Sequence, residues 1–428
     1  MAASRILADQ LWKRSVREHY WAASRTGKRV VNLMSSTNRP FARVVGKDTL
    51  RFLLGAVRPI PGETQRRALA AVEWICRAQD ATEDDGVAFG YFPCDGIQGW
   101  RASYPETTGY LITSLLEYAH RYRYAAARER ALRMAHWEVQ IQMANGAVQG
   151  GPVCPPEEQT PCVFNTGMVL DGWVTAYQET GDTLYVEAGR RAAEYLLSDM
   201  TEEGYFRTNG QFVASNSVKT YNCLCAWALY RLGDCTLEDR YRQAAVRAIE
   251  AALRQQHANG WFANNCLDRP EAPLLHTIGY TLQGILEVGI LAGREDVVAA
   301  LMRGVEPILS RISPKGFLPG RFYSDWEPAS FSSCLTGSAQ LAVVCYRLHE
   351  HTGVGKYQSA ADRLLNFLKA LQALDAPCPA INGALAGSFP IFGSYMTAGY
   401  PNWASKYFLD GLMFQDRLQG SCKSAPVS

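Results

Sequence analysis

A repeat of glycine-centred turns constrains the fold of this chain more than any other feature. After a first turn at Gly86, later turns are centred on Gly146, Gly204, Gly260, Gly316 and Gly383. The last five glycines are separated by 58, 56, 56 and 67 residues. Self-similarity at such a period indicates one supersecondary unit that is stacked many times. The 428 residues are therefore read as repeats rather than as two or three average domains.

Two kinds of helix alternate between these turns. Residues 167–177, 223–232, 278–291 and 339–348 are almost wholly apolar, and such helices must be buried on all sides. The segments 126–143, 184–199, 238–256, 296–311 and 354–374 are amphipathic and rich in Arg, Glu and Ala, which is typical of an outer layer with one wet face. A further helix is expected from about residue 61 to Asp80.

The alternation predicts an all-α fold, an (α/α)6 toroid in which six inner helices are surrounded by six outer helices. An open α-solenoid is the alternative, but loops of near-constant length on one side and an irregular sixth repeat favour a closed ring. We expect residues 1–60 to form an N-terminal arm or cap, residues 61–418 the barrel, and residues 419–428 a flexible tail.

Composition narrows the class of partner. Lys+Arg 43 against Asp+Glu 41 leaves a net charge of +2, too little to create a global field for nucleic acid or anionic lipid. No apolar run approaches a membrane span and the first residues lack a signal-peptide core, so a cytoplasmic protein is expected. The twelve cysteines are scattered without nearby histidines, and we predict neither a metal site nor a cofactor. A homo-oligomer remains compatible with the sequence.

Candidate functional residues occur where the inner helices begin. In a toroid all six begin at one end, so their unpaired N–H groups converge on a funnel that attracts negative charge. These starts carry Glu106, Asn165, Lys219 with Tyr221, His276 with Tyr280, Thr336, and Asn402 with Lys406. The preceding loops add Trp100, Arg101, Arg269 and the segment 321–327, which contains Arg321, Tyr323, Asp325, Trp326 and Glu327. Aromatic rings at Tyr91, Trp100, Tyr323, Trp326, Tyr400 and Trp403 are expected to form a platform for sugar rings.

Each candidate also has a purely structural explanation. Asn165 and Thr336 are good N-cap residues, and Glu106 in a first helical turn complements the helix dipole. Histidine is a poor N-cap, however, and a helix start lowers its pKa and keeps it neutral, as a general base should be. His276 is therefore the sharpest catalytic candidate. Trp261 and Phe262 are expected to be wedges between outer helices.

Two sequence segments resemble known toroid families. Residues 256–262, Gln-His-Ala-Asn-Gly-Trp-Phe, resemble the Q-x-x-x-G-W turns of terpene cyclases and prenyltransferases, but the DxDD acid motif and the zinc ligands of those proteins are missing, as is the zinc signature of LanC-like cyclases. Residues 400–407, Tyr-Pro-Asn-Trp-Ala-Ser-Lys-Tyr, are similar to a Pro-Asn-x-Ala stretch in the C-terminal domain of D-glucuronyl C5-epimerases. The closer likeness is therefore to carbohydrate-active (α/α) barrels, which include polysaccharide lyases and glycoside hydrolases.

This resemblance implies an enzyme that acts on an acidic, uronate-containing oligosaccharide or polysaccharide. For a lyase or epimerase, Asn165, Arg321 or Lys219 would neutralise the carboxylate, His276 or a tyrosine would remove the C5 proton, and Tyr221, Tyr280 or Tyr323 would serve as the acid. Asn402, Trp403 and Lys406 would also contact substrate. A glycoside hydrolase would instead use Glu106 and Asp325, with Glu327 and Asp95 in reserve, at a separation of about 5.5 Å if retaining or roughly 6.5–9.5 Å if inverting. A non-catalytic toroid that binds glycan or protein is the third reading.

Overall fold

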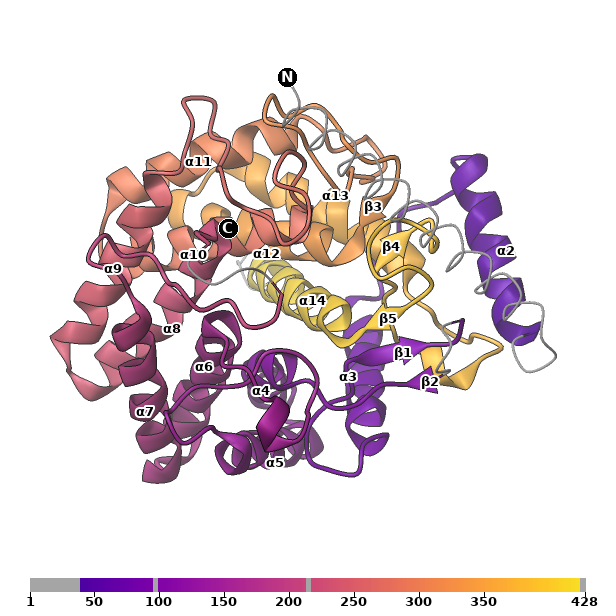
Figure 1. Cartoon of the computed structure of the whole chain (residues 1–428). Helices are drawn as coiled ribbons and strands as arrows, with labels where there is room; N and C mark the ends of the chain where they lie inside the picture. The colour runs from indigo at the N-terminus through magenta and orange to yellow at the C-terminus, as the bar shows by residue number, and fades with distance from the viewer. Residues whose placement is uncertain (1–38, 95–98, 213–216, 424–428) are drawn as a thin grey trace, which may run out of the picture.

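The computed structural model describes residues 39–94, 99–212 and 217–423, and within them twelve helices form a closed double ring (Figure 1). The outer helices are α3 (Thr64–Asp80), α5 (Ala125–Ile141), α7 (Thr183–Asp199), α9 (Asp239–Leu253), α11 (Glu295–Leu309) and α13 (Gly355–Leu371). The inner helices are α4 (Pro105–Tyr122), α6 (Val163–Thr180), α8 (Leu224–Thr236), α10 (Leu275–Leu291), α12 (Leu335–Thr352) and α14 (Asn402–Lys423).

The ring closes between the two ends of the barrel sequence. Each inner helix packs against the next one along the chain, and the last, α14, packs against both α3 and α4. At this seam the Lys369 ammonium donates to the Thr64 hydroxyl at 2.9 Å, and Gln372 Nε2 donates to the carbonyl of Arg67 at 3.0 Å. The predicted toroid is therefore confirmed, and the open solenoid is wrong.

Burial explains why the two sets of helices differ in sequence. Every residue of α10 from Leu275 to Gly289 is buried, because inner helices contact the ring on both sides and the barrel centre. In α9 the buried residues follow one stripe, with Tyr241, Ala245 and Ile249 among them. The apolar and amphipathic patterns thus correspond to the inner and outer rings.

The repeated glycines join each turn to the next outer helix. Gly260 has φ +85°, and a Cβ there would lie 2.0 Å from the backbone oxygen of Arg303 in α11. Gly383, with φ +90°, would meet the oxygen of Ala70 in α3 in the same way. Only glycine combines this conformation with so close an approach. The second contact fixes the last turn to the first helix and so completes the ring.

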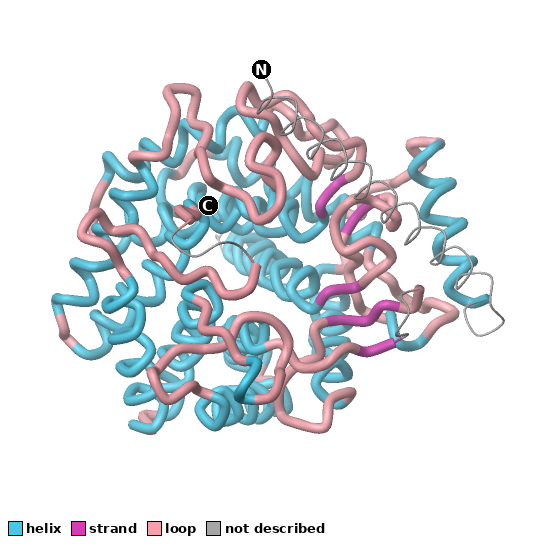
Figure 2. The backbone as a smooth tube through the Cα atoms, viewed as in Figure 1, coloured by secondary structure: helices cyan, strands magenta, loops and turns pink. Residues whose placement is uncertain are grey.

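Loops gather at the end of the barrel where the inner helices begin (Figure 2). They include the sheet β2-β1-β5 (Gly99–Trp100, Gly90–Phe92, Tyr400–Pro401), the pair β3-β4 (Ser333–Cys334, Ser388–Phe389), and the 3-10 turns η2 (Pro156–Glu158), η3 (Thr220–Cys223) and η4 (Pro379–Ile381). The turn η3 introduces α8, where a single helix from Cys223 was expected.

The chain outside the barrel differs partly from expectation. Helix α2 (Arg39–Leu53) packs beside the β-strands, where Phe52 contacts Phe389 with ring centroids 5.6 Å apart (Figure 1). Residues 1–38, the rest of the expected arm, lie outside the described residues. At the other end α14 continues to Lys423, so the tail does not begin at 419, and residues 424–428 also lie outside the description.

Candidate active site

A cavity of about 260 Å³ opens where the inner helices begin. Its aromatic walls come from several different repeats. The described residues that line it are Phe89, Tyr104, Glu106, Cys162, Phe164, Asn165, Asn209, Phe212, Tyr221, Asn222, Leu267, His276, Thr277, Tyr280, Tyr395, Met396 and Trp403. A concave, largely apolar pocket with a few converging polar groups is the usual form of a small-ligand site. We call it the funnel cavity.

Glu106 brings a carboxyl group into this cavity from the first turn of α4. Burial raises its pKa to about 7, while the hydrogen bond donated by the Tyr104 hydroxyl at 3.0 Å acts in the opposite direction. A carboxyl group that is half ionised near neutral pH can both accept and return a proton. Glu106 therefore meets the requirement for a general acid or base.

His276 lies in the first turn of α10 and is held neutral. Burial lowers the pKa of its imidazole to about 3, and the nearby Lys406 charge lowers it further, whereas the hydrogen bond to Gln340 opposes the shift. Nδ1 lies 3.0 Å from the Gln340 side-chain amide. The same amide lies 3.1 Å from the His276 carbonyl oxygen, which can only accept, so the amide nitrogen faces both that oxygen and Nδ1. The ring proton is therefore on Nε2, which makes the neutral imidazole a donor at that atom.

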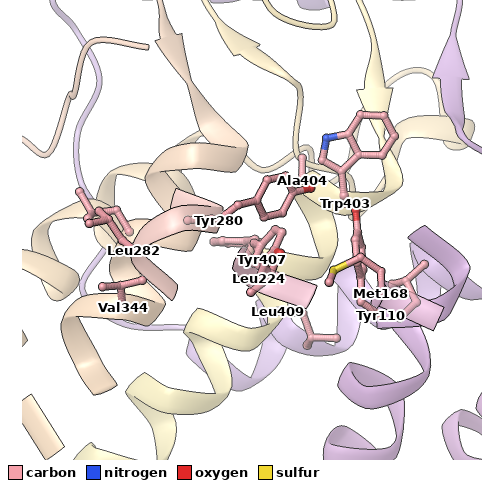
Figure 3. Close-up of a cluster of buried hydrophobic side chains, with 14 of the residues drawn as sticks. Tyr110, Met168, Leu224, Tyr280, Leu282, Val344, Trp403, Ala404, Tyr407 and Leu409 are labelled. Atoms are coloured by element: carbon pink, nitrogen blue, oxygen red, sulfur yellow. The ribbon is translucent and has the colours of Figure 1, made fainter. Parts of the chain in front are cut away.

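Tyr280 of α10 lines the cavity and packs against aromatic rings from two other inner helices, α6 and α14. Tyr280 lies against His276, with ring centroids 4.1 Å apart, and its other neighbours include Phe164 at 4.6 Å and Tyr407 at 6.2 Å. In Figure 3 Tyr280 and Tyr407 lie in one cluster of buried side chains, with Trp403 above them in this view. Burial raises the pKa of Tyr280 well above its ordinary value, so its hydroxyl stays protonated and can act as a donor.

Asparagine side chains on two inner-helix starts complete the polar lining. Asn165 Nδ2 donates to the carbonyl of Gln149 at 2.8 Å, and Asn222 Nδ2 donates to Asn209 Oδ1 at 3.0 Å. The Oδ1 atoms of Asn165 and Asn222 are buried and have no hydrogen-bond partner within the protein. Buried polar atoms are nearly always paired in folded proteins. Because Asn165 and Asn222 line the cavity, their oxygens are acceptors that a ligand hydroxyl there can satisfy.

Six of the residues predicted from the sequence meet in the funnel cavity. They are Glu106, Asn165, Tyr221, His276, Tyr280 and Trp403. Tyr221 lies in η3 and packs edge-on against Phe164, with ring centroids 5.5 Å apart. Their convergence follows from the parallel inner ring, because each stands at or near the start of its helix. Their catalytic and binding roles stay predictions.

The loop 321–327 does not line the cavity, contrary to expectation. Trp326 is buried against Trp261 at 5.4 Å and donates from Nε1 to the carbonyl of Asn259, so it is part of the scaffold. Asp325 is exposed, and its carboxylate accepts from the backbone N–H of Glu327 at 3.0 Å. Arg321 is buried in an ion pair with Asp268, and Tyr323 is largely exposed. The structure therefore does not bring Asp325 to Glu106.

The other predicted contact residues are not among the described residues that line the cavity. Asn402 is fully buried and donates to the carbonyl of Ala88 and to Thr107 Oγ1, which fastens α14 to the first loop. Lys406 pairs with Asp410 at 2.7 Å and lies over the Tyr407 ring. Trp100 packs on Trp74 and Tyr91, Arg101 lies 5.5 Å from the Phe92 ring, and Lys219 precedes η3. Asp95 lies outside the described residues.

Several lining residues were not anticipated because they come from loops. Asn209 and Phe212 follow the Gly204 turn, and Tyr395 precedes α14 and accepts a hydrogen bond from Trp403 Nε1 at 2.7 Å. Asn209 could have been identified from its position, because it lies in the loop that precedes an inner helix, where other candidates were sought. Asn222 lies one residue beyond Tyr221 and was missed because 3-10 geometry turns both side chains toward the cavity.

A larger cavity of about 500 Å³ lies between α2 and the barrel. Five phenylalanines line it, with Arg51 and Lys315 among the polar residues, and no carboxyl, imidazole or phenol group occurs among its described lining residues. No cluster of His, Cys, Asp and Glu suited to a metal ion occurs within the described ranges. None of the described helices is long and apolar enough to cross a membrane.

Comparison with known proteins gives a fold but no family. Neither a protein-family description nor a curated protein matches the sequence. Among solved structures, a heparin-specific unsaturated glucuronyl hydrolase aligns with TM-score 0.66 at 14% identity, over 83% of this chain and 98% of that one. A D-mannose isomerase aligns with TM-score 0.66 at 11% identity, over 84% of this chain and 98% of its own.

A third structure extends the range of chemistry found on this fold. The cellobiose 2-epimerase of Bacillus thermoamylovorans aligns with TM-score 0.62 at 10% identity, over 87% of this chain and 99% of that one. The chain thus has the (α/α)6 toroid fold of these carbohydrate-active enzymes, which include a hydrolase, an isomerase and an epimerase. Fold likeness at such low identity does not carry an activity, so function must be argued from the funnel cavity.

Proposed function

We propose that this protein is a carbohydrate-active enzyme that moves a proton at a carbon atom of a sugar bound in the funnel cavity, as an epimerase, isomerase or lyase does. The observation that carries the proposal is the meeting of Glu106 and His276 in one aromatic pocket. One has a pKa of about 7 and the other is held neutral, and environments that push titratable groups toward such values are typical of catalytic sites.

The proposed chemistry needs a substrate with an acidic C–H bond. A carbon next to a uronate carboxylate or next to the carbonyl of an open-chain sugar meets this need. The ionised Glu106 carboxylate removes the proton from that carbon, and His276, with its proton on Nε2, is a neutral donor beside it. A protonated tyrosine such as Tyr280 or Tyr221 then donates a hydrogen bond or a proton to the oxygen or carbon that gains electron density. The uronate-containing glycan expected from the sequence is one member of this substrate class.

Hydrolysis by two carboxylates is supported less well. Such a mechanism needs a second carboxyl group within roughly 5–9.5 Å of the first, across the scissile bond. Among the described lining residues Glu106 supplies the carboxylate, and Asp325 is engaged with a backbone N–H of its own exposed loop. Proton transfer at carbon requires one base and one neutral donor, and Glu106 and the protonated Tyr280 in the cavity lining meet these requirements.

Solvent exchange tests the proposal directly. The protein is incubated in D2O with D-glucuronate- and L-iduronate-containing oligosaccharides and with reducing sugars, and products are read by NMR and by the absorbance of unsaturated uronate. We expect deuterium at the carbon next to the carboxylate or carbonyl, with new absorbance only if a bond is eliminated. Glu106→Gln and His276→Ala should each lower the exchange rate by at least about a hundredfold, whereas Asp325→Asn, at the exposed loop, should not.

The same experiment separates the alternatives. Release of free sugar without deuterium at carbon would identify a hydrolase. Binding without exchange or cleavage by the folded wild-type protein would identify a binding toroid. Either result would overturn proton transfer at carbon.

A further inference from the structure

The orientation of the cavity asparagines indicates what kind of group they recognise. An amide presents an acceptor oxygen on one side and a donor nitrogen on the other, and which side faces the ligand depends on the partners of the other side. Asn165 Nδ2 lies 2.8 Å from the carbonyl oxygen of Gln149. A carbonyl oxygen can only accept, so the nitrogen must face it, and the acceptor oxygen of Asn165 is left for the cavity.

Asn222 is oriented through a second asparagine. Asn209 Nδ2 donates to the carbonyl of Ser217 at 3.0 Å, which fixes the Asn209 amide in the same way. Its Oδ1 therefore faces Asn222 and accepts from Asn222 Nδ2 at 3.0 Å. The Asn222 oxygen is then the free end of this chain of hydrogen bonds. The backbone thus determines that both helix starts present acceptors.

Both oxygens lack a partner although their side chains are almost completely buried. Asn165 is 1% exposed and Asn222 is 3% exposed, and neither Oδ1 makes a hydrogen bond within the protein. Each belongs to a residue that lines the funnel cavity. An unpaired acceptor in an apolar site is strongly unfavourable, and a ligand hydroxyl that donates to it relieves this cost.

The same oxygens disfavour a carboxylate. A carboxylate is an acceptor only, so it would face two amide oxygens and the Glu106 carboxyl group with no donor from them unless Glu106 is protonated. Of the two cations expected to neutralise it, Arg321 pairs with Asp268, and neither Arg321 nor Lys219 is among the described residues that line the cavity. The asparagine on α6 is therefore not the carboxylate-binding group that the sequence suggested.

We infer that the funnel cavity binds a neutral sugar through hydroxyl groups that donate to Asn165 Oδ1 and Asn222 Oδ1, and that it excludes a uronate ring from this position. The inference rests on the proposed function only in taking the ligand to be a sugar. If a neutral sugar occupies the site, the acidic C–H bond required for proton transfer lies next to a carbonyl group rather than a carboxylate.

Calorimetric titration of the full-length protein tests this inference with matched sugars. D-glucose, D-mannose and D-galactose are compared with D-glucuronate, D-mannuronate and D-galacturonate, each pair differing only at C6. At least one neutral sugar should bind more tightly than its uronate by about tenfold or more. A uronate that binds more tightly than its neutral counterpart, or failure of every neutral sugar to bind, would overturn the inference.

Amide variants then assign the contact. Asn165→Leu and Asn222→Leu should each weaken the neutral sugar about five- to tenfold, and Asn366→Leu serves as the control. Asn366 also has a buried oxygen without a partner, but it lies in α13 outside the funnel cavity, so its replacement should leave affinity unchanged. Monodeoxy analogues supply a readout that does not depend on variant stability. One of them should bind the wild-type protein more weakly than the parent sugar, and this difference should vanish in the corresponding asparagine variant.

The outcomes distinguish the two proposals. Binding of neutral sugars that depends on Asn165 or Asn222, without deuterium exchange, would leave this inference standing and overturn the proposed function. Deuterium exchange into a uronate that is unaffected by replacing either asparagine would support the proposed function and overturn this inference. A loss on deoxygenation that persists unchanged in both asparagine variants would also overturn the inference.

Discussion

At the scale of single residues, Glu106 has a pKa that its surroundings raise toward neutral pH, as catalysis by proton transfer requires. Its folded pKa of about 7 lies above the ordinary value of 4.5 because the carboxylate is poorly solvated. Between these values the folded protein holds a proton that the unfolded chain has released, so this group lowers stability progressively as pH rises from about 4.5 to 7. Above pH 7 the full penalty is present.

Replacing Glu106 with Gln should therefore stabilise the protein in a pH-dependent way. We expect Glu106→Gln to match the wild-type melting temperature at pH 4.5 and to exceed it by on the order of 1–3 °C at pH 8, because glutamine cannot ionise. Calorimetry at both pH values measures the difference. A constant difference across this range would mean that the Glu106 pKa is ordinary. Tyr104→Phe should have the opposite effect at pH 8, since it removes the hydrogen bond that supports the carboxylate.

His276 should make the free energy of unfolding fall as the pH is lowered, which is the opposite of the effect of Glu106. The unfolded chain binds a proton at this residue below about pH 6.5, whereas the buried imidazole stays neutral down to about pH 3. This contribution to stability is complete above pH 6.5 and is lost as pH falls. We expect the wild-type protein to lose roughly 2 kcal/mol between pH 7 and pH 5 from this residue alone. In urea titrations at the two pH values, His276→Asn should lack that part of the loss, and an equal loss in both proteins would contradict a buried neutral His276.

At the scale of elements, the turns that carry the repeat should tolerate substitution far less than the helix ends. Gly260→Ala would both strain the positive φ and place a Cβ 2.0 Å from the Arg303 oxygen of α11. Gly293, just after α10, is the matched control, because it also has positive φ but no atom within 4 Å of a built Cβ. We expect Gly293→Ala to cost roughly 1–2 kcal/mol and Gly260→Ala at least about twice as much. Equal unfolding free energies for the two variants in urea would contradict the tight joint.

The elements were predictable because their signals are local. Alternation of apolar and amphipathic helices determines the two rings, and inner-helix starts such as those of Glu106 and His276 converge once the ring is parallel. The loops were not predictable, because their paths depend on contacts between repeats. Trp326 was expected at the surface of the funnel, yet it turns back onto Trp261 of another loop. Asn209 supports Asn222 through a hydrogen bond that no spacing in the sequence reveals.

At the scale of the whole molecule, the closed ring changes how repeats share stability. In an open array each repeat contacts only its neighbours, so a defect at the end is mild and unfolding can proceed in steps. Here the last turn packs on the first outer helix, where Gly383 meets Ala70, and the Lys369–Thr64 and Gln372–Arg67 hydrogen bonds lie along the same seam. The first and last repeats are therefore each supported by a neighbour on both sides, as the repeats in the middle of the chain are.

Substitution at the seam tests this equivalence. We expect Gly383→Ala to lower the free energy of unfolding about as much as Gly260→Ala, because both introduce a Cβ at 2.0 Å from a backbone oxygen of the next outer helix. Both variants should still unfold in one transition. Loss of packing between any two neighbouring repeats of a closed ring destabilises both of them. Calorimetry together with far-UV and tryptophan signals gives the comparison. A mild effect of Gly383→Ala, or an early transition confined to the terminal repeats, would show that the seam is energetically open even though its helices touch.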